Sequence, residues 1–113
     1  MQTRTVAELT AARDKIANGW AQNIEMTTDD DGQLRFCSIG ALRMAVLEQI
    51  GHRGPVQERL YNDQRVVEMA ITELTTGPWE YDLIDWNDAA GRTQAEVVEA
   101  FDRAIKIAER DEL

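Results

Sequence analysis

Apolar residues near the C-terminus recur with the spacing of one helix face. Thr93 and Glu96 have the form of a capping box, in which a threonine oxygen and a glutamate three residues later bond the free amides at a helix start. The apolar positions that follow at i, i+3, i+4 and i+7 spacing are Val97, Ala100, Phe101, Ala104, Ile105 and Ala108. This segment predicts an amphipathic helix that buries one face.

The same reasoning predicts two helices in the first half of the chain. Thr5 and Glu8 form another capping-box pattern, and the helix that begins there is expected to end near Asn18-Gly19. A second apolar period begins at Ser38 and runs to Gly51, where glycine supplies a helix stop.

A further helical segment is predicted from Val56 to Thr75, with a break near Asn62-Asp63. Asp63 would cap a second helical piece there, because its side chain can accept a bond from a free amide. The face expected to be buried consists of Val66 or Val67, Ala70, Ile71 and Leu74. The segment from Trp79 to Asp88 is interpreted as one short helical turn, and the side chains expected inside are Leu83, Ile84 and Trp86.

The segment from Trp20 to Thr28 lacks a helical period, and Thr27 to Gly32 has the composition of a turn. We expect an exposed loop here, with a short β-hairpin near residues 24–36. The whole pattern predicts an all-α protein, with residues 1–113 forming a single small domain of four to five helices.

Length and composition exclude several protein classes. With 113 residues, 43% hydrophobic and 29% charged, the chain suits one globular domain rather than a disordered or membrane protein. The N-terminus carries no apolar run of signal-peptide length, so a cytoplasmic protein is expected.

The chain contains few residues that could bind a metal ion or form a disulfide bond. Cys37 is the single cysteine, which excludes an intrachain disulfide framework, and the chain has one histidine. The run from Asp29 to Gly32 suggests calcium, but an EF-hand loop would place Thr27 first and Ser38 twelfth, where carboxylates are required. We predict no bound metal and no cofactor.

Acidic residues outnumber basic ones, and the excess is uneven. The net charge is −9, and residues 58–113 hold fourteen acidic and six basic residues. Between Glu80 and Asp102, seven acidic residues face Arg92 alone. This charge argues against binding nucleic acid or an anionic membrane, because both need a basic patch. It is expected to attract a basic protein partner, and a sharper variant is an acidic mimic of DNA.

Cys37 is the one candidate nucleophile. It stands at a predicted helix start, where free amides and the helix dipole lower a thiol pKa. A nucleophile also needs a base, and His52 lies past the far end of the same helix, roughly 20 Å away at about 1.5 Å per residue. We interpret Cys37 as a small buried residue under Ala41 and Leu42, with a catalytic thiol as the alternative.

The stretch Trp86-Asn87-Asp88-Ala89-Ala90-Gly91-Arg92-Thr93 allows two interpretations. As a turn, Asn87 or Asp88 closes the chain reversal through its side chain, Gly91 supplies a flexible joint, and Thr93 caps the last helix. As a binding site, these polar side chains would form a pocket beside Trp86, with Arg92 holding an anion. The turn is favoured, because every residue in it has an ordinary local role.

Three short segments resemble a family of small uncharacterised proteins of actinobacteria and of the phages that infect them. The segments are Phe36-Cys37 running into Gly40-Ala41-Leu42, Trp86-Asn87-Asp88, and Arg92-Thr93 at the start of the last helix. The resemblance spans most of the chain from Trp20 onward. It implies that the Cys37 segment faces the Trp86 turn, with Cys37 and Gly40 allowing close packing there. A phage member would act in the host cytoplasm.

The chain has no nucleotide loop, no metal set, and no assembled nucleophile and base, so we favour a non-enzymatic accessory protein that binds a protein partner. The alternative is an enzyme or small-ligand-binding protein with a pocket between Cys37 and Trp86-Asn87-Asp88-Arg92. The pattern specifies no oligomeric state.

Overall fold

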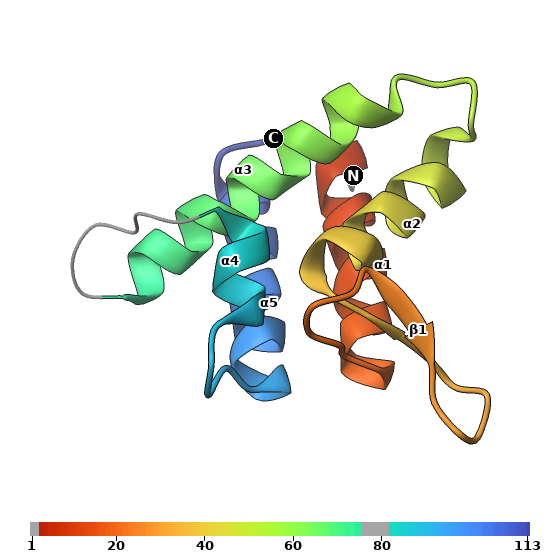
Figure 1. Cartoon of the computed structure of the whole chain (residues 1–113). Helices are drawn as coiled ribbons and strands as arrows, with labels where there is room; N and C mark the ends of the chain where they lie inside the picture. Colours follow the sequence, from red (N-terminus) through yellow and green to blue (C-terminus); the bar gives the residue numbers. More distant parts are fainter. Residues whose placement is uncertain (1–2, 76–81) are drawn as a thin grey trace.

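Figure 1 shows a helical protein with one protruding β-hairpin. The computed structural model describes residues 3–75 and 82–113, and these ranges contain five helices and two strands. In chain order the elements are α1 (Arg4–Asn18), β1 (Met26–Thr28), β2 (Leu34–Phe36), α2 (Ser38–Ile50), α3 (Val56–Leu74), α4 (Leu83–Asp88) and α5 (Gln94–Arg110). The predicted all-α class, with a short hairpin inside residues 24–36, is confirmed.

The helices pack around one apolar core. α1 lies against α2 and α5, and α3 contacts the same two helices. Among the largest fully buried side chains are Leu9 and Ile16 of α1, Leu42 of α2 and Phe101 of α5. Burying a side chain of this size contributes about 1.5–3 kcal/mol. Packing of the helices therefore fixes where their ends and the connecting loops lie.

The capping box at Thr93 is confirmed, whereas the one at Thr5 is wrong. Thr93 Oγ1 accepts a bond from the Glu96 amide at 3.2 Å, and Glu96 Oε1 accepts one from the Thr93 amide at 2.9 Å. The N-cap of α1 is instead Thr3, whose Oγ1 accepts from a backbone amide at 3.1 Å. Thr5 and Glu8 are buried within α1, because Glu8 faces an arginine of α3 rather than its own helix start.

The predicted break in the helix after Pro55 is also wrong. α3 continues through Asn62-Asp63 as one helix, and Asp63 is fully buried rather than placed at a cap. Leu74, expected to be buried, is 37% exposed at the end of this helix. Asp63 can lie on the buried face of α3 because Arg59 and Asn62 supply polar partners there.

α4 buries a narrower face than expected. Leu83 and Trp86 point into the core at i, i+3 spacing, while Ile84 is 45% exposed. A helix of six residues makes fewer than two turns at about 3.6 residues per turn, so it can turn only one stripe inward. Trp79, predicted in the same helical turn, lies outside the described residues.

The hairpin is held against the helices by its inner strand. β1 pairs antiparallel with β2, and Met26 lies opposite Phe36. On its other side, Phe36 forms a bridge with Trp20, and the Phe36 amide donates to the Gly19 carbonyl at 2.9 Å. A Cβ atom at Gly19 would collide with the Leu34 carbonyl oxygen, so this approach requires glycine. These contacts fix the loop over residues 20–25.

Candidate functional site

Asn87 lies at the centre of a buried hydrogen-bond network, here called the Asn87 clamp. Its Oδ1 accepts bonds from Trp20 Nε1 at 2.9 Å, from the Ser38 amide at 3.0 Å and from Ser38 Oγ at 2.7 Å. Its Nδ2 donates to the Ala21 carbonyl at 3.1 Å and to Asp88 Oδ1 at 2.9 Å. One uncharged side chain thereby joins α4 to the start of α2 and to the loop after α1.

The polypeptide around Asn87 strengthens this junction. Gln22 Nε2 donates to the Asn87 carbonyl at 3.1 Å and to the Ala89 carbonyl at 3.0 Å. The Asn23 amide donates to Asp88 Oδ1 at 2.8 Å. Asn23 has a φ of 66°, a left-handed conformation that asparagine tolerates better than most residues. The loop is thus held in one shape beside α4.

Arg92 and Thr93 are engaged in local contacts. The Arg92 guanidinium lies over the Trp86 ring, 4.1 Å from its centroid, and Arg92 Nε donates to the Trp86 carbonyl at 2.9 Å. Its Nη1 donates to Glu96 Oε2 at 3.3 Å. Thr93 caps α5. These contacts favour the turn interpretation for both residues, while an anion held by Arg92 stays a prediction.

Cys37 is the N-cap of α2, so its predicted place at a helix start is confirmed. Its Sγ accepts a bond from the Gly40 amide at 3.4 Å, and the residue is 6% exposed. Burial raises the pKa of the Cys37 thiol, and the charges of Asp88 and Glu25 raise it further, which outweighs the bonds from backbone amides. The favoured interpretation of Cys37 as a small buried residue agrees with its burial, and the lowered pKa that the catalytic alternative requires receives no support.

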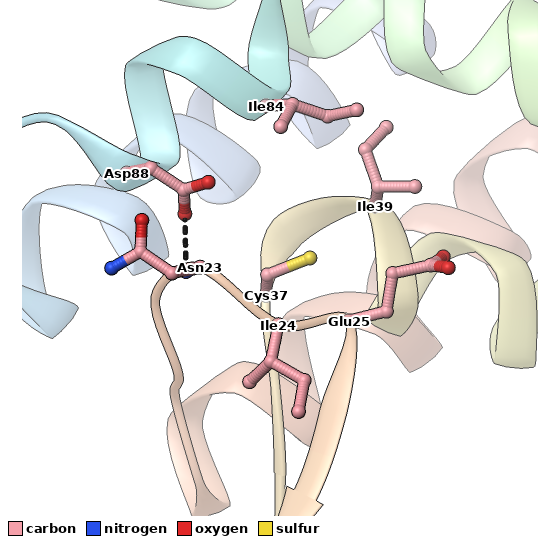
Figure 2. A pocket seen from close by; sticks show the side chains of 7 residues that line it. All are labelled: Asn23, Ile24, Glu25, Cys37, Ile39, Ile84 and Asp88. Atoms are coloured by element: carbon pink, nitrogen blue, oxygen red, sulfur yellow. Dashed lines mark hydrogen bonds between the residues drawn. The ribbon is translucent and has the colours of Figure 1, made fainter.

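A pocket of about 150 Å³ opens beside Cys37. Its lining residues are Asn23, Ile24, Glu25, Cys37, Ile39, Ile84 and Asp88. Figure 2 shows Ile39 of α2 and Ile84 of α4 converging on one side, and Asn23 bonded to Asp88 on the other. Apolar side chains form the walls, and two carboxylates stand at the edge.

Only some of the binding residues that were predicted from the sequence line the pocket. Cys37 and Asp88 line it, so the Cys37 segment and the Trp86 turn do lie side by side, as the family resemblance implies. Trp86, Asn87, Arg92 and Thr93 are not among its lining residues. Gly40 was expected to pack closely against the Trp86 turn, but it packs against Glu25 instead. A Cβ atom at Gly40 would collide with the Glu25 carbonyl oxygen.

A second buried polar group joins α1 to α3, and sequence reasoning missed it. Arg59 Nη2 donates to Glu8 Oε1 at 2.8 Å and to Thr5 Oγ1 at 2.8 Å, and it lies 3.5 Å from Asp63 Oδ1. Asn62 Nδ2 donates to Asp63 Oδ1 at 3.0 Å. The side chains of Glu8 and Asp63 are fully buried, so two carboxylates share one guanidinium. We call this group the carboxylate pair.

Two buried carboxyl groups beside one guanidinium favour retention of a proton by the carboxylate pair. Burial raises the pKa of Asp63 to about 8, and the neighbouring Glu8 carboxyl contributes in the same direction. Glu8 Oε2 and Asp63 Oδ2 are both buried and accept no bond from another described residue. A proton shared between the two carboxyls would satisfy these oxygens and, together with Arg59, balance the charge.

Several carboxylates of the acidic region over residues 80–102 have contacts within the protein. Asp82 caps α4 by accepting from the Asp85 amide at 3.0 Å, and Asp88 belongs to the Asn87 clamp. Asp102 forms an ion pair with Arg13 at 2.9 Å. These groups stabilise the fold, which leaves fewer of them for a docking surface.

The family comparison supplies the identity that the geometry alone does not. The family model described as a family of unknown function, DUF6197, matches residues 1–107. The chain belongs to this family. Membership of an uncharacterised family agrees with the resemblance found in the sequence. No curated protein matches this DUF6197 chain, and no solved structure matches it.

Two further features bear on the class of this DUF6197 protein. Over residues 3–75 and 82–113, every helix is too short or too polar to cross a membrane. The same residues contain no cluster of histidine, cysteine and carboxylate side chains suited to a metal ion.

Proposed function

We propose that this DUF6197 protein is a small acidic accessory protein, of actinobacterial or phage origin, that acts in the cytoplasm by binding a protein partner. The observation that carries the proposal is the pocket beside Cys37, together with the exposed isoleucines at its mouth. Ile24 is 50% exposed and Ile84 is 45% exposed. Side chains of this kind around a hollow are typical of an interaction site. We call the pocket with Ile24 and Ile84 the pocket surface.

The size of the pocket favours a side chain over a metabolite. Pockets for small molecules span about 300–1,000 Å³, whereas an apolar cavity of about 150 Å³ accommodates a group the size of benzene. The volume of about 150 Å³ found here matches one apolar side chain of a partner. An anchor residue in a pocket of this size is a common source of binding energy at protein interfaces.

The charges at the pocket edge favour a basic partner. Asp88 and Glu25 line the pocket, and the chain carries a net charge of −9. Glu25 is paired with Arg43 at 3.0 Å on an exposed surface, where such a pair contributes little. A partner that places lysine or arginine beside its apolar anchor would gain from both carboxylates. The association rate should then fall as salt is added.

An enzyme or small-ligand protein is the second candidate, and the chemistry of Cys37 argues against it. Burial raises the pKa of the Cys37 thiol. His52 lies beyond the C-terminal end of α2, whereas Cys37 caps the N-terminus of that helix. A nucleophilic cysteine needs a lowered pKa or an adjacent base. A mimic of DNA also receives less support, because ordered carboxylates such as Asp102 and Glu96 bond arginines of the same chain.

The test is a selection of short random peptides, displayed on phage, against the immobilised full chain. We expect the enriched peptides to share one large apolar residue with lysine or arginine beside it. Ile84→Asp should weaken their binding about tenfold or more, because a loss of about 1.4 kcal/mol corresponds to that factor.

Met69→Asp is the matched control, since Met69 is 43% exposed on α3 and is not among the residues that line the pocket. It should leave peptide binding unchanged. The proposed function fails if no peptide is enriched, or if the two substitutions have the same effect.

A further inference from the structure

The outer edge of β1 continues directly into the pocket surface. β2 is the inner strand, because Phe36 is bonded to Gly19 and Ala21 on the side that faces the helices. β1 therefore forms the outer edge of the hairpin (Figure 1). The residues immediately before this strand, Asn23 to Glu25, line the pocket.

The pairing pattern leaves main-chain groups of β1 directed outward. The Cys37 amide donates to the Glu25 carbonyl at 3.1 Å, and the Asp29 amide donates to the Gln33 carbonyl at 3.0 Å. In an antiparallel ladder, residues alternate between facing their partner strand and facing away. In this register, Thr27 faces β2 while the amide and carbonyl groups of Met26 and Thr28 point to the open edge. Within residues 3–75 and 82–113, nothing bonds these outward groups.

Exposed apolar side chains accompany the open edge. Met26 is 47% exposed and Leu34 is 44% exposed. Leu34 lies directly opposite Thr28, and Thr28 is two positions after Met26 in β1. The side chains of Met26 and Leu34 therefore project from the same face of the hairpin. Together with Ile24 they extend the apolar character of the pocket surface along the strand.

We propose that the partner binds as an extended segment that adds a strand to the outer edge of β1 and places one apolar side chain in the pocket. The inference rests on the proposed function and specifies its binding mode. Strand addition uses main-chain bonds for affinity and side-chain pockets for specificity. An extended chain alongside Met26 and Thr28 would pass the pocket mouth at Asn23 to Glu25, where the carboxylates of Glu25 and Asp88 attract a basic flank.

The pocket and the strand edge have complementary roles in this arrangement. The edge offers two outward-facing residues, so main-chain bonds alone would hold a peptide weakly. The pocket supplies the anchor, and the strand edge fixes the direction and register of the bound segment. The partner segment must therefore be extended, and it must carry its apolar anchor near one end of the paired stretch.

The test is an N-methyl scan of the tightest synthetic peptide obtained from the display selection, with binding to the full chain measured by calorimetry. Methylation removes one amide donor at a time and leaves the side chains in place. Residues of the peptide that pair with β1 should lose about threefold to tenfold in affinity, and the residues between them should not, because net hydrogen-bond contributions lie in that range. A period of two in the losses is the expected result.

Amide hydrogen exchange gives a second readout on the protein itself. Peptide binding should slow exchange at Met26 and Thr28, and the Thr27 amide, which already faces β2, should change little. A flat methyl scan with unchanged exchange at Met26 and Thr28 would overturn strand addition. If such a peptide still loses affinity with Ile84→Asp, docking in the pocket stands. If no peptide depends on Ile84, the proposed function fails with it.

Discussion

The Asn87 clamp and the carboxylate pair are both buried polar groups that join elements distant in the sequence. The clamp meets the cost of burial with hydrogen bonds to a neutral amide, whereas the pair buries charged groups. Asn87 is uncharged, and both atoms of its amide have partners at 3.1 Å or less. The pair places Glu8 and Asp63 around Arg59, with more carboxylate charge than one guanidinium neutralises. The amide of Asn87 at the centre of the clamp carries no titratable proton, whereas the carboxylate pair depends on one.

The difference follows from the cost of burying charge. A buried neutral amide costs little once its donors and acceptors are bonded, whereas a buried carboxylate needs a charge partner or a proton. Burial raises the pKa of Asp63 to about 8, which favours a proton on the carboxylate pair. The clamp is therefore suited to holding the pocket in one shape, while the pair makes the α1–α3 contact sensitive to solution conditions.

The largest expected effect is the loss of the cation in the carboxylate pair. Arg59→Met keeps a long apolar side chain but leaves Glu8 and Asp63 uncompensated, so the free energy of unfolding should fall by about 4 kcal/mol. Urea denaturation measures it. Arg65→Met on the exposed face of the same helix is the control and should cost about 0.5 kcal/mol or less. Equal costs for the two variants would show that the pair does not need its arginine.

The clamp should fail by a different mechanism. Asn87→Ala removes the acceptor for Trp20 Nε1 and for the Ser38 amide, and an unsatisfied buried donor costs about 1–3 kcal/mol, so a loss of about 3 kcal/mol is expected. Asn18→Ala, at an exposed asparagine, should change stability by about 0.5 kcal/mol or less. The loss at Asn87 should be the same at about pH 5 and about pH 9, since no proton is involved. A strong pH dependence would contradict the comparison.

The next test uses pH to separate the two regions. The folded pKa of Asp63 is about 8 against an ordinary value of 3.8, so the folded state holds a proton that the unfolded state releases. This contribution is fully present below the ordinary pKa and is lost as pH rises through about 8. Asp63→Asn imitates the protonated form, so from about pH 5 to about pH 9 it should gain at least about 1 kcal/mol of unfolding free energy relative to the native chain.

Asp111→Asn provides the control for this pH series. The hydrogen bond from Arg110 lowers the pKa of Asp111, so its contribution is lost only as pH falls toward that pKa. Its difference from the native chain should therefore stay constant from about pH 5 to about pH 9. If the Asp63→Asn difference is constant as well, the carboxylate pair holds no proton.

The sequence predicted the regular parts of this fold because their signals are local. The apolar period after Thr93 requires only that one face of α5 be buried, and the turn residues between 27 and 32 lie within one hairpin. The same local rule failed at Thr5 and Glu8, whose spacing is identical to that of Thr93 and Glu96. Glu8 forms an ion pair with Arg59 instead of capping the helix, and Arg59 is distant in the sequence.

The candidate site was predicted only in part for the same reason. Asn87 looks like a turn residue, and its partners Trp20 and Ser38 lie 67 and 49 positions away. One signal for the carboxylate pair was present in the sequence. Asp63 follows Leu60 by three positions and precedes Val67 by four, so it occupies the apolar face of its helix, where a carboxylate needs a buried partner.

The smallest expected effect concerns Cys37. Burial raises the pKa of its thiol, as it raises the pKa of the Asp63 carboxyl. The rate of reaction with a thiol reagent should be low at neutral pH and should rise with a midpoint above the ordinary value of about 8.5. The chain unfolded in urea is the reference and should show that ordinary midpoint. Fast labelling of the folded protein with a lowered midpoint would support the enzyme alternative, because it would mean that the helix start and not burial controls this thiol.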